Sequence, residues 1–218
     1  MERKHLTENS WLDETILSEN LLANNEQFLE MWNLHPTEKH KVKIFGKMTE
    51  IPRFQQAYLR DYTFSGSESK SLPLPDIFKP YLDWMNSLGN SSDNSLGYGE
   101  FNQFLVNWYQ NGENYIGSHA DDEKQLISDS PIVSITLCMG GSFDESGNFN
   151  LLDKYIPRKF RIRDKNKKII EDVETTNGLV LIMGGKFQKE FKHEIVKISG
   201  KKAELTGPRI SITLRQFK

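Results

Sequence analysis

From Phe101 onward, apolar and polar residues alternate in short segments that are separated by clusters of Gly, Asn and Asp. Regular alternation with such punctuation is typical of the strands of a sandwich or jelly roll. The expected strands lie in the segments FNQFLVNWY, YIGSHAD, IVSITLC, FNLLDKY, KFRIR, KIIEDVE, GLVLIMGG, HEIVKI and RISITLR. The pattern therefore predicts a mainly β (α+β) fold of the double-stranded β-helix type, with its jelly roll over residues 101–218.

The first hundred residues have a different pattern. Apolar residues follow a helical stripe in residues 24–34 and again between Pro75 and Gly89, which predicts two helices. Between them, HKVKIFGKMTEIP alternates like a hairpin with its turn at Phe45-Gly46. No repeat or long linker divides the chain. We therefore expect one domain over 1–218, in which helices of residues 1–100 brace one face of the jelly roll.

Composition limits the class of protein. The chain has 218 residues, a formal net charge of −2 and one cysteine, Cys138. Its longest apolar run, LVLIM, is too short to cross a bilayer, and its charged N-terminus lacks the apolar core of a secretory signal. A single cysteine excludes an intrachain disulfide, so we expect a reducing compartment, the cytoplasm or the nucleus. We also expect a monomer that does not contact a membrane.

One segment is strongly basic despite the acidic balance. KYIPRKFRIRDKNKK, residues 154–168, holds eight basic residues against the single acidic residue Asp164. Such a segment, with aromatic residues interleaved, can lie along a phosphate backbone. The alternative is a solvated hairpin.

Two histidines and a carboxylate suggest a metal site. His119 and Asp121 are two residues apart, so in an extended segment their side chains project to the same face. His193 lies in the strand-like FKHEI. This set holds non-haem Fe(II) and leaves positions for other ligands, so we assign the three as metal ligands and catalytic residues. Zinc is chemically possible, and a surface histidine beside an acidic run is the alternative for the His-x-Asp pair.

The strand RISITLR suggests an anion site. Its isoleucines and leucine share one face, and Arg209, Ser211, Thr213 and Arg215 share the other. The polar face either meets solvent or lines a ligand cavity, where a buried arginine needs an anionic partner. A dicarboxylate meets that need. The metal set and the anion site together predict an oxygenase that uses Fe(II), O2 and 2-oxoglutarate.

With these motifs the chain resembles the AlkB family of Fe(II)/2-oxoglutarate dealkylating dioxygenases, especially the DNA-repair homologues of animals and viruses. The match runs from about Ile44 to Arg215. The family pattern N-x-Y, H-x-D, distal H and R-x-N-x-T-x-R occurs here as Asn107-Trp-Tyr109, His119-Ala-Asp121, His193 and RISITLR, with Ser211 in place of the usual Asn.

This resemblance implies roles for individual residues. It implies that His119, Asp121 and His193 bind iron, that Arg209 pairs with the distal carboxylate of 2-oxoglutarate and that Arg215 lies near its chelating end. Asn107, Tyr109 and Thr213 complete the co-substrate site. Six residues of the nucleotide-recognition region and its surroundings are assigned to the substrate: Phe45, Arg53, Tyr62, Phe64, Ser65 and Glu123.

In the related DNA-acting enzymes, Tyr62 and Phe64 correspond to aromatic residues that border the flipped base. Glu123 corresponds to an acidic residue that contacts the exocyclic amine of the base, and Phe45 to an aromatic wedge in the DNA stack. The alternative for these three aromatic residues is ordinary packing.

The implied activity is direct-reversal DNA repair. It is the oxidative demethylation of 1-methyladenine and 3-methylcytosine in alkylated DNA, or also in RNA, with release of formaldehyde, succinate and CO2. One alternative keeps the same chemistry and acts on RNA, tRNA or a protein. Another is a jelly-roll binding module without catalysis.

Overall fold

Alternating strands assemble into two facing sheets. The structure, a computed structural model, describes residues 1–218 apart from 45, 65, 90–98, 145 and 147, and only the backbone of 43, 44, 64 and 89. The large sheet contains β1 (Glu2–His5), β2 (Ser10–Ile16), β5 (Phe54–Tyr58), β8 (Ser71–Leu72), β9 (Gln103–Tyr109), β11 (Ile132–Cys138), β16 (Leu179–Gly185) and β18 (Arg209–Arg215). The small sheet contains β10 (Ile116–His119), β14 (Arg158–Asp164), β15 (Ile169–Thr175) and β17 (Phe191–Ile195).

The strand order is β1-β2-β16-β11-β18-β9-β5-β8 in the large sheet and β10-β17-β14-β15 in the small sheet. Neighbouring strands are antiparallel, except that β5 and β8 are parallel. Three further hairpins pair β3 (Lys41–Ile44) with β4 (Lys47–Glu50), β6 (Tyr62–Phe64) with β7 (Ser67–Ser69), and β12 (Gly141–Phe143) with β13 (Phe149–Leu151). The jelly-roll prediction is confirmed, and each of the nine expected segments contains a strand.

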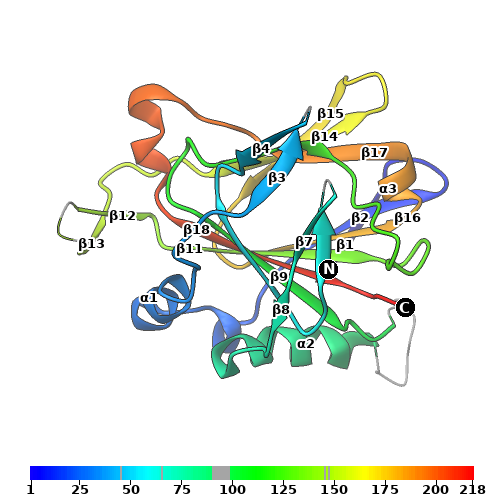
Figure 1. The fold of residues 1–218 in the computed structure, drawn as a ribbon, viewed down its shortest axis with the longest axis horizontal. Helices are drawn as coiled ribbons and strands as arrows, with labels where there is room; N and C mark the ends of the chain where they lie inside the picture. Colours follow the sequence, from blue (N-terminus) through cyan, green and yellow to red (C-terminus); the bar gives the residue numbers. More distant parts are fainter. Residues whose placement is uncertain (45, 65, 90–98, 145, 147) are drawn as a thin grey trace.

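Short helices complete the fold. They are η1 (Glu19–Leu21), α1 (Asn25–Trp32), η2 (Asp76–Phe78), α2 (Lys79–Gly89), α3 (Phe187–Glu190), η3 (Gly200–Lys202) and η4 (Glu204–Thr206). Figure 1 shows α1 and α2 on one side of the large sheet, with β14, β15 and β17 on the other side. The two predicted helices and the hairpin at residues 41–50 are confirmed. Within the described residues, no helix has the length and apolar character that crossing a bilayer requires.

The large sheet is buried on both faces, so its central strands present two kinds of side chain. On β9, Phe104, Val106 and Trp108 face the helices in one apolar cluster. The indole of Trp108 donates to the backbone oxygen of Met31 in α1 at 3.0 Å. The opposite face of β9, with Asn107 and Tyr109, points toward the small sheet, where the site forms.

Strands β1 and β2 were not predicted. All four side chains of β1 are exposed, so no apolar alternation marks it, although β2 pairs with β16 along seven residues. β5 and β8 were missed as well. The first hundred residues therefore contribute four strands to the large sheet, in addition to the bracing helices.

Candidate active site

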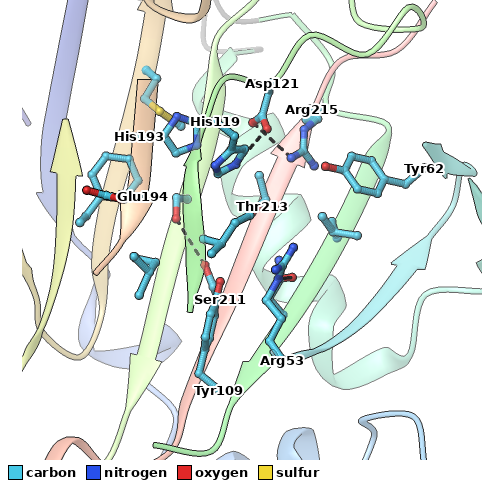
Figure 2. A pocket seen from close by; sticks show the side chains of 17 residues that line it. Arg53, Tyr62, Tyr109, His119, Asp121, His193, Glu194, Ser211, Thr213 and Arg215 are labelled. Carbon is cyan, nitrogen blue, oxygen red and sulfur yellow. Dashed lines mark hydrogen bonds and ion pairs between the residues drawn. The ribbon is translucent and has the colours of Figure 1, made fainter. Parts of the chain in front are cut away.

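The two histidines and the aspartate converge between the sheets. His119 ends β10 and lies directly opposite His193 in β17, and Asp121 follows two residues after His119. One potential ligand atom from each of the three residues lies within 4.8 Å of the others. Figure 2 shows these side chains pointing toward one another. This spacing suits coordination of one metal ion by three protein ligands.

The three groups have the protonation states that a metal requires. Burial lowers the pKa of His119, and it lowers the pKa of His193 to about 3. Burial opposes ionisation of Asp121, but Arg215 and the two histidines outweigh it and bring the pKa of this carboxyl to about 2. At neutral pH the site therefore offers two uncharged imidazoles and one carboxylate, which are the forms that bind a divalent cation.

Arg215 holds Asp121 in place. Its Nη2 lies 3.2 Å from Asp121 Oδ2, and its Nη1 donates to Gln103 Oε1 at 3.1 Å. Its Nε lies 4.0 Å from Glu123 Oε1. Among the described residues, no hydrogen-bond partner reaches the other aspartate oxygen, Oδ1, which is buried and 3.6 Å from His119 Nε2. That oxygen is left for a cation.

The polar face of β18 is enclosed: Ser211, Thr213 and Arg215 line the cavity, and Arg209 lies behind Ser211. Arg209, Ser211 and Arg215 are buried, and Thr213 is half-buried. The apolar residues of the same strand pack against the helices. This face therefore lies along an enclosed cavity and not on the outer surface of the protein.

Arg209 is a fully buried cation for which no carboxylate forms an ion pair among the described residues. Its Nη2 donates to Thr136 Oγ1 at 2.9 Å and to Ser211 Oγ at 3.4 Å, and its Cζ lies 5.1 Å from the centre of the Tyr109 ring. In the described part of the chain, its Nε and Nη1 have no hydrogen-bond partner. A buried guanidinium with two idle donors fits a carboxylate ligand.

Arg53 and Asn107 form a second wall of the cavity. Arg53 Nε donates to Asn107 Oδ1 at 2.7 Å, and Nη2 donates to Gln55 Oε1 at 3.2 Å. Since the amide oxygen of Asn107 is engaged by Arg53, its amide nitrogen is the atom available to a ligand in the cavity. Arg53 also lines an adjoining groove, so it borders both spaces.

The adjoining groove runs beside the metal site. It is lined by segments 49–53 and 115–120, with Val42, Thr63, Asp122, Glu123 and Lys192. Tyr62 lines the metal cavity and is buried; burial raises the pKa of its hydroxyl well above the ordinary value. Burial, with the neighbouring Asp121, also raises the pKa of Glu123.

The remaining substrate assignments lie outside the described structure. Phe45 and Ser65 are not among the described residues, and only the backbone of Phe64 is described, in β6. Their proposed contacts with a base or a duplex stay predictions. Gly46, which follows Phe45, has a φ of +82°, in keeping with the expected turn.

Four of the eight basic residues in segment 154–168 have partners within the protein; one of them is Lys159, which lies 3.3 Å from Asp172. Arg161 forms two short contacts to Asp172, at 2.6 and 2.8 Å, and Arg163 pairs with Glu194 at 2.8 Å. Arg158 is fully buried and donates to three backbone oxygens. All three of its arginines therefore support the small sheet, as the hairpin interpretation expects. Among the described residues Lys154, Lys165, Lys167 and Lys168 form no ion pair, and a phosphate contact by these lysines stays a prediction.

Several residues in or next to the cavity were not identified from the sequence. Ser134 and Thr136 on β11 lie opposite Thr213 and Ser211 on β18. Their polar side chains at alternate positions of an apolar strand were a usable signal. Gln188, which contacts Asp121, had no such signal, because it lies in a charged segment, KFQKE, without periodicity.

Comparisons with known proteins agree with this geometry. The model of the 2OG-Fe(II) oxygenase superfamily matches residues 9–215. The chain is 28% identical over 180 residues to the DNA oxidative demethylase ALKBH2 of Bos taurus, covering 81% of this chain and 57% of that protein. It is 25% identical to the Homo sapiens protein of the same name, covering 81% and 61%. The chain thus spans less than two thirds of the length of these curated relatives.

Two solved structures share the fold. The structure of OsALKBH1 has a TM-score of 0.54 at 18% identity and covers 99% of this chain and 100% of that chain. A Pseudomonas putida prolyl-4-hydroxylase has a TM-score of 0.54 at 15% identity, covering 95% and 92%. The resemblance to the AlkB family is confirmed. Since the family model covers nearly the whole chain and the converging His119, Asp121 and His193 can hold a metal, the chain belongs to the 2OG-Fe(II) oxygenase superfamily.

Proposed function

We propose that the chain is an Fe(II)- and 2-oxoglutarate-dependent dioxygenase that removes methyl groups from ring nitrogens of bases in DNA. Its substrates would be 1-methyladenine and 3-methylcytosine. The observation that carries the proposal is one cavity lined by three potential metal ligands, with the buried cation Arg209 in contact with Ser211 and Tyr109 of its lining. A metal set alone, or a buried arginine alone, would not require a keto-acid co-substrate.

The residues in and next to the cavity fit an iron ion and 2-oxoglutarate. His119, Asp121 and His193 would hold Fe(II), and Arg209, with Tyr109 beside it, would bind the distal carboxylate of 2-oxoglutarate. Asn107, oriented by Arg53, would donate its amide N–H to the other end of the co-substrate. When bound, iron, 2-oxoglutarate and O2 supply the oxidant that hydroxylates the N-methyl carbon, giving succinate and CO2, after which the base is released with loss of formaldehyde.

Substrate charge supports a methylated base. A base methylated on its pairing edge is cationic, and it would approach Glu123, whose side chain is 4% exposed, and the ring of Tyr62. Arg215, whose guanidinium carbon lies 4.8 Å from the centre of that ring and whose Nε lies 4.0 Å from Glu123 Oε1, would hold these two side chains in position. The chain's part is orientation, electrostatics and exclusion of water.

The relatives support DNA as the target, because the curated proteins that match are named DNA oxidative demethylases. Nothing in the described residues favours RNA or a protein instead. The non-catalytic module is disfavoured, because the three potential metal ligands are buried or half-buried and converge.

The test is anaerobic reconstitution with Fe(II) and 2-oxoglutarate, then addition of a methylated oligonucleotide and air, with mass spectrometry of the oligonucleotide. We expect loss of one methyl group per lesion together with formation of succinate. Asp121→Ala should abolish turnover, whereas Asp83→Ala, which changes an exposed carboxylate of α2 on the far side of the large sheet, should retain it. Succinate without loss of methyl from DNA, but with loss from RNA, would move the proposal to RNA. No loss from either would refute it.

A further inference from the structure

Asp121 lies beyond the end of β10, outside the backbone pairing of β10 with β17. β10 ends at His119, and its pairing with β17 aligns Ile116 with Ile195 and His119 with His193, with an irregularity between them. Asp121 comes two residues later, in a segment without regular structure. Arg215 fixes its carboxylate, but its backbone needs a partner of its own.

That partner is a glutamine side chain. The amide oxygen of Gln188 accepts the backbone N–H of Asp121 at 3.0 Å. The amide nitrogen of Gln188 donates to Met183 Sδ at 3.5 Å, and Met183 lines the metal cavity. Gln188 thus reaches across 67 positions of sequence to the loop that carries one metal-binding residue.

The helix that carries Gln188, α3, is held in place by packing and by hydrogen bonds at both ends. Gln188 lies in α3, whose Phe187 is fully buried. Asn9, just before β2, and Ser10, its first residue, contact the two ends of this helix. The backbone N–H of Lys186 donates to Asn9 O at 2.8 Å, and the hydroxyl of Ser10 donates to Glu190 Oε2 at 2.6 Å.

The close approach of this segment depends on a glycine. Gly185, just before α3, has a φ of +64°, and a Cβ there would lie 2.1 Å from Asn9 O. Any other residue would be strained in this conformation and would push the N-terminal segment away from α3.

We infer that Gln188 is a positioning residue for the metal centre: it holds the backbone of Asp121 so that the carboxylate faces the two histidines. His193 follows α3 by three residues, so the segment Phe187–His193 supplies one metal ligand and positions another. Outer partners of this kind orient metal ligands, and their loss commonly weakens metal binding. The inference rests on the proposed metal site and is independent of the substrate.

The experiment titrates the metal-free protein with Co(II) alone and follows the visible absorption of the bound ion. Gln188→Met keeps the length of the side chain and removes the acceptor, so its dissociation constant should rise roughly tenfold. Gln188→Glu keeps an acceptor oxygen in the same place and should restore most of the affinity. Gln188→Asp carries the same charge but is one methylene too short to reach, and it should remain weak.

Lys189→Met is the matched control, because Lys189 is the next residue of α3 and pairs with the exposed Asp129 at 2.7 Å. It should bind Co(II) like the unaltered protein. The melting temperature of each metal-free variant separates binding from folding. The inference would be overturned if Gln188→Met bound Co(II) with the affinity of the unaltered protein, whether or not its melting temperature fell. It would also be overturned if Gln188→Asp restored the Co(II) affinity as fully as Gln188→Glu. If the unaltered protein binds no Co(II), the metal site and this inference fail together. A lack of demethylation by a protein that binds Co(II) contradicts the proposed function alone.

Discussion

Replacing Arg209 with methionine should separate ligand binding from protein stability. Arg209 is a fully buried cation whose Nε and Nη1 lack partners among the described residues, and burial lowers its pKa. A buried charge without an ionic partner costs folding free energy, and an apolar side chain of similar length removes that cost. We therefore expect the melting temperature of the metal-free Arg209→Met protein to stay the same or to rise.

The same change should remove most of the affinity for 2-oxoglutarate. Hydrogen bonds between charged groups contribute roughly 1.5–3 kcal/mol each. The two idle donors of Arg209 could form a bidentate pair, so a loss of about 3 kcal/mol is a conservative value. This loss of binding free energy corresponds to a roughly 150-fold larger dissociation constant for 2-oxoglutarate.

The assay is isothermal titration of the protein with 2-oxoglutarate in the presence of Mn(II), together with melting curves with and without the co-substrate. Arg161→Met is the control, because Arg161 pairs with Asp172 at the surface of the small sheet and should leave binding unchanged. Unchanged 2-oxoglutarate affinity in Arg209→Met would refute the assignment. Destabilisation of the metal-free variant by several kcal/mol would show that the charge is structural.

Three further outcomes are expected. Arg53→Ala should weaken 2-oxoglutarate binding even without nucleic acid, because Asn107 loses the donor that orients its amide; unchanged binding would limit Arg53 to the groove. The metal-free protein should lose stability as the pH falls from about 6.5 toward 3, because burial lowers the pKa of His193 from 6.5 to about 3 and the unfolded chain takes up that proton first; a melting temperature that does not fall between pH 7 and pH 5 would contradict this. Arg161→Ala should leave the affinity for a DNA duplex unchanged in a gel-shift titration, since its guanidinium is already bound to Asp172, and a marked loss would restore the basic segment as a DNA contact.

The strands of the jelly roll could be predicted because their alternation reports which face is buried. β1 could not, since its four side chains are exposed and its pairing with β2 depends on the backbone. The order of His119, Asp121, His193 and the two arginines of RISITLR was sufficient to predict a common site. The structure brings the first three together with Arg215, and Arg209 contacts the cavity lining through Ser211.

Contacts between distant segments were beyond the sequence. The partners of the basic residues, Asp172 and Glu194, lie on neighbouring strands, and only the register of the small sheet reveals the pairs. Gln188 was missed for the same reason. The single-domain organisation, the monomeric state, the compartment and the roles of Phe45, Phe64 and Ser65 stay predictions.

β18 contributes one face to the cavity and the other to the apolar core, so the register of this strand affects both the site and the fold. A slip of this strand by one residue against β9 and β11 would turn its guanidinium groups toward Phe104 and Trp108 and its aliphatic side chains into the cavity. Misaligned molecules would lose the apolar contacts with the helices and the anion site at once. Variants in the core of this strand should thus lower the fraction of competent molecules, while those that fold retain full turnover per bound metal.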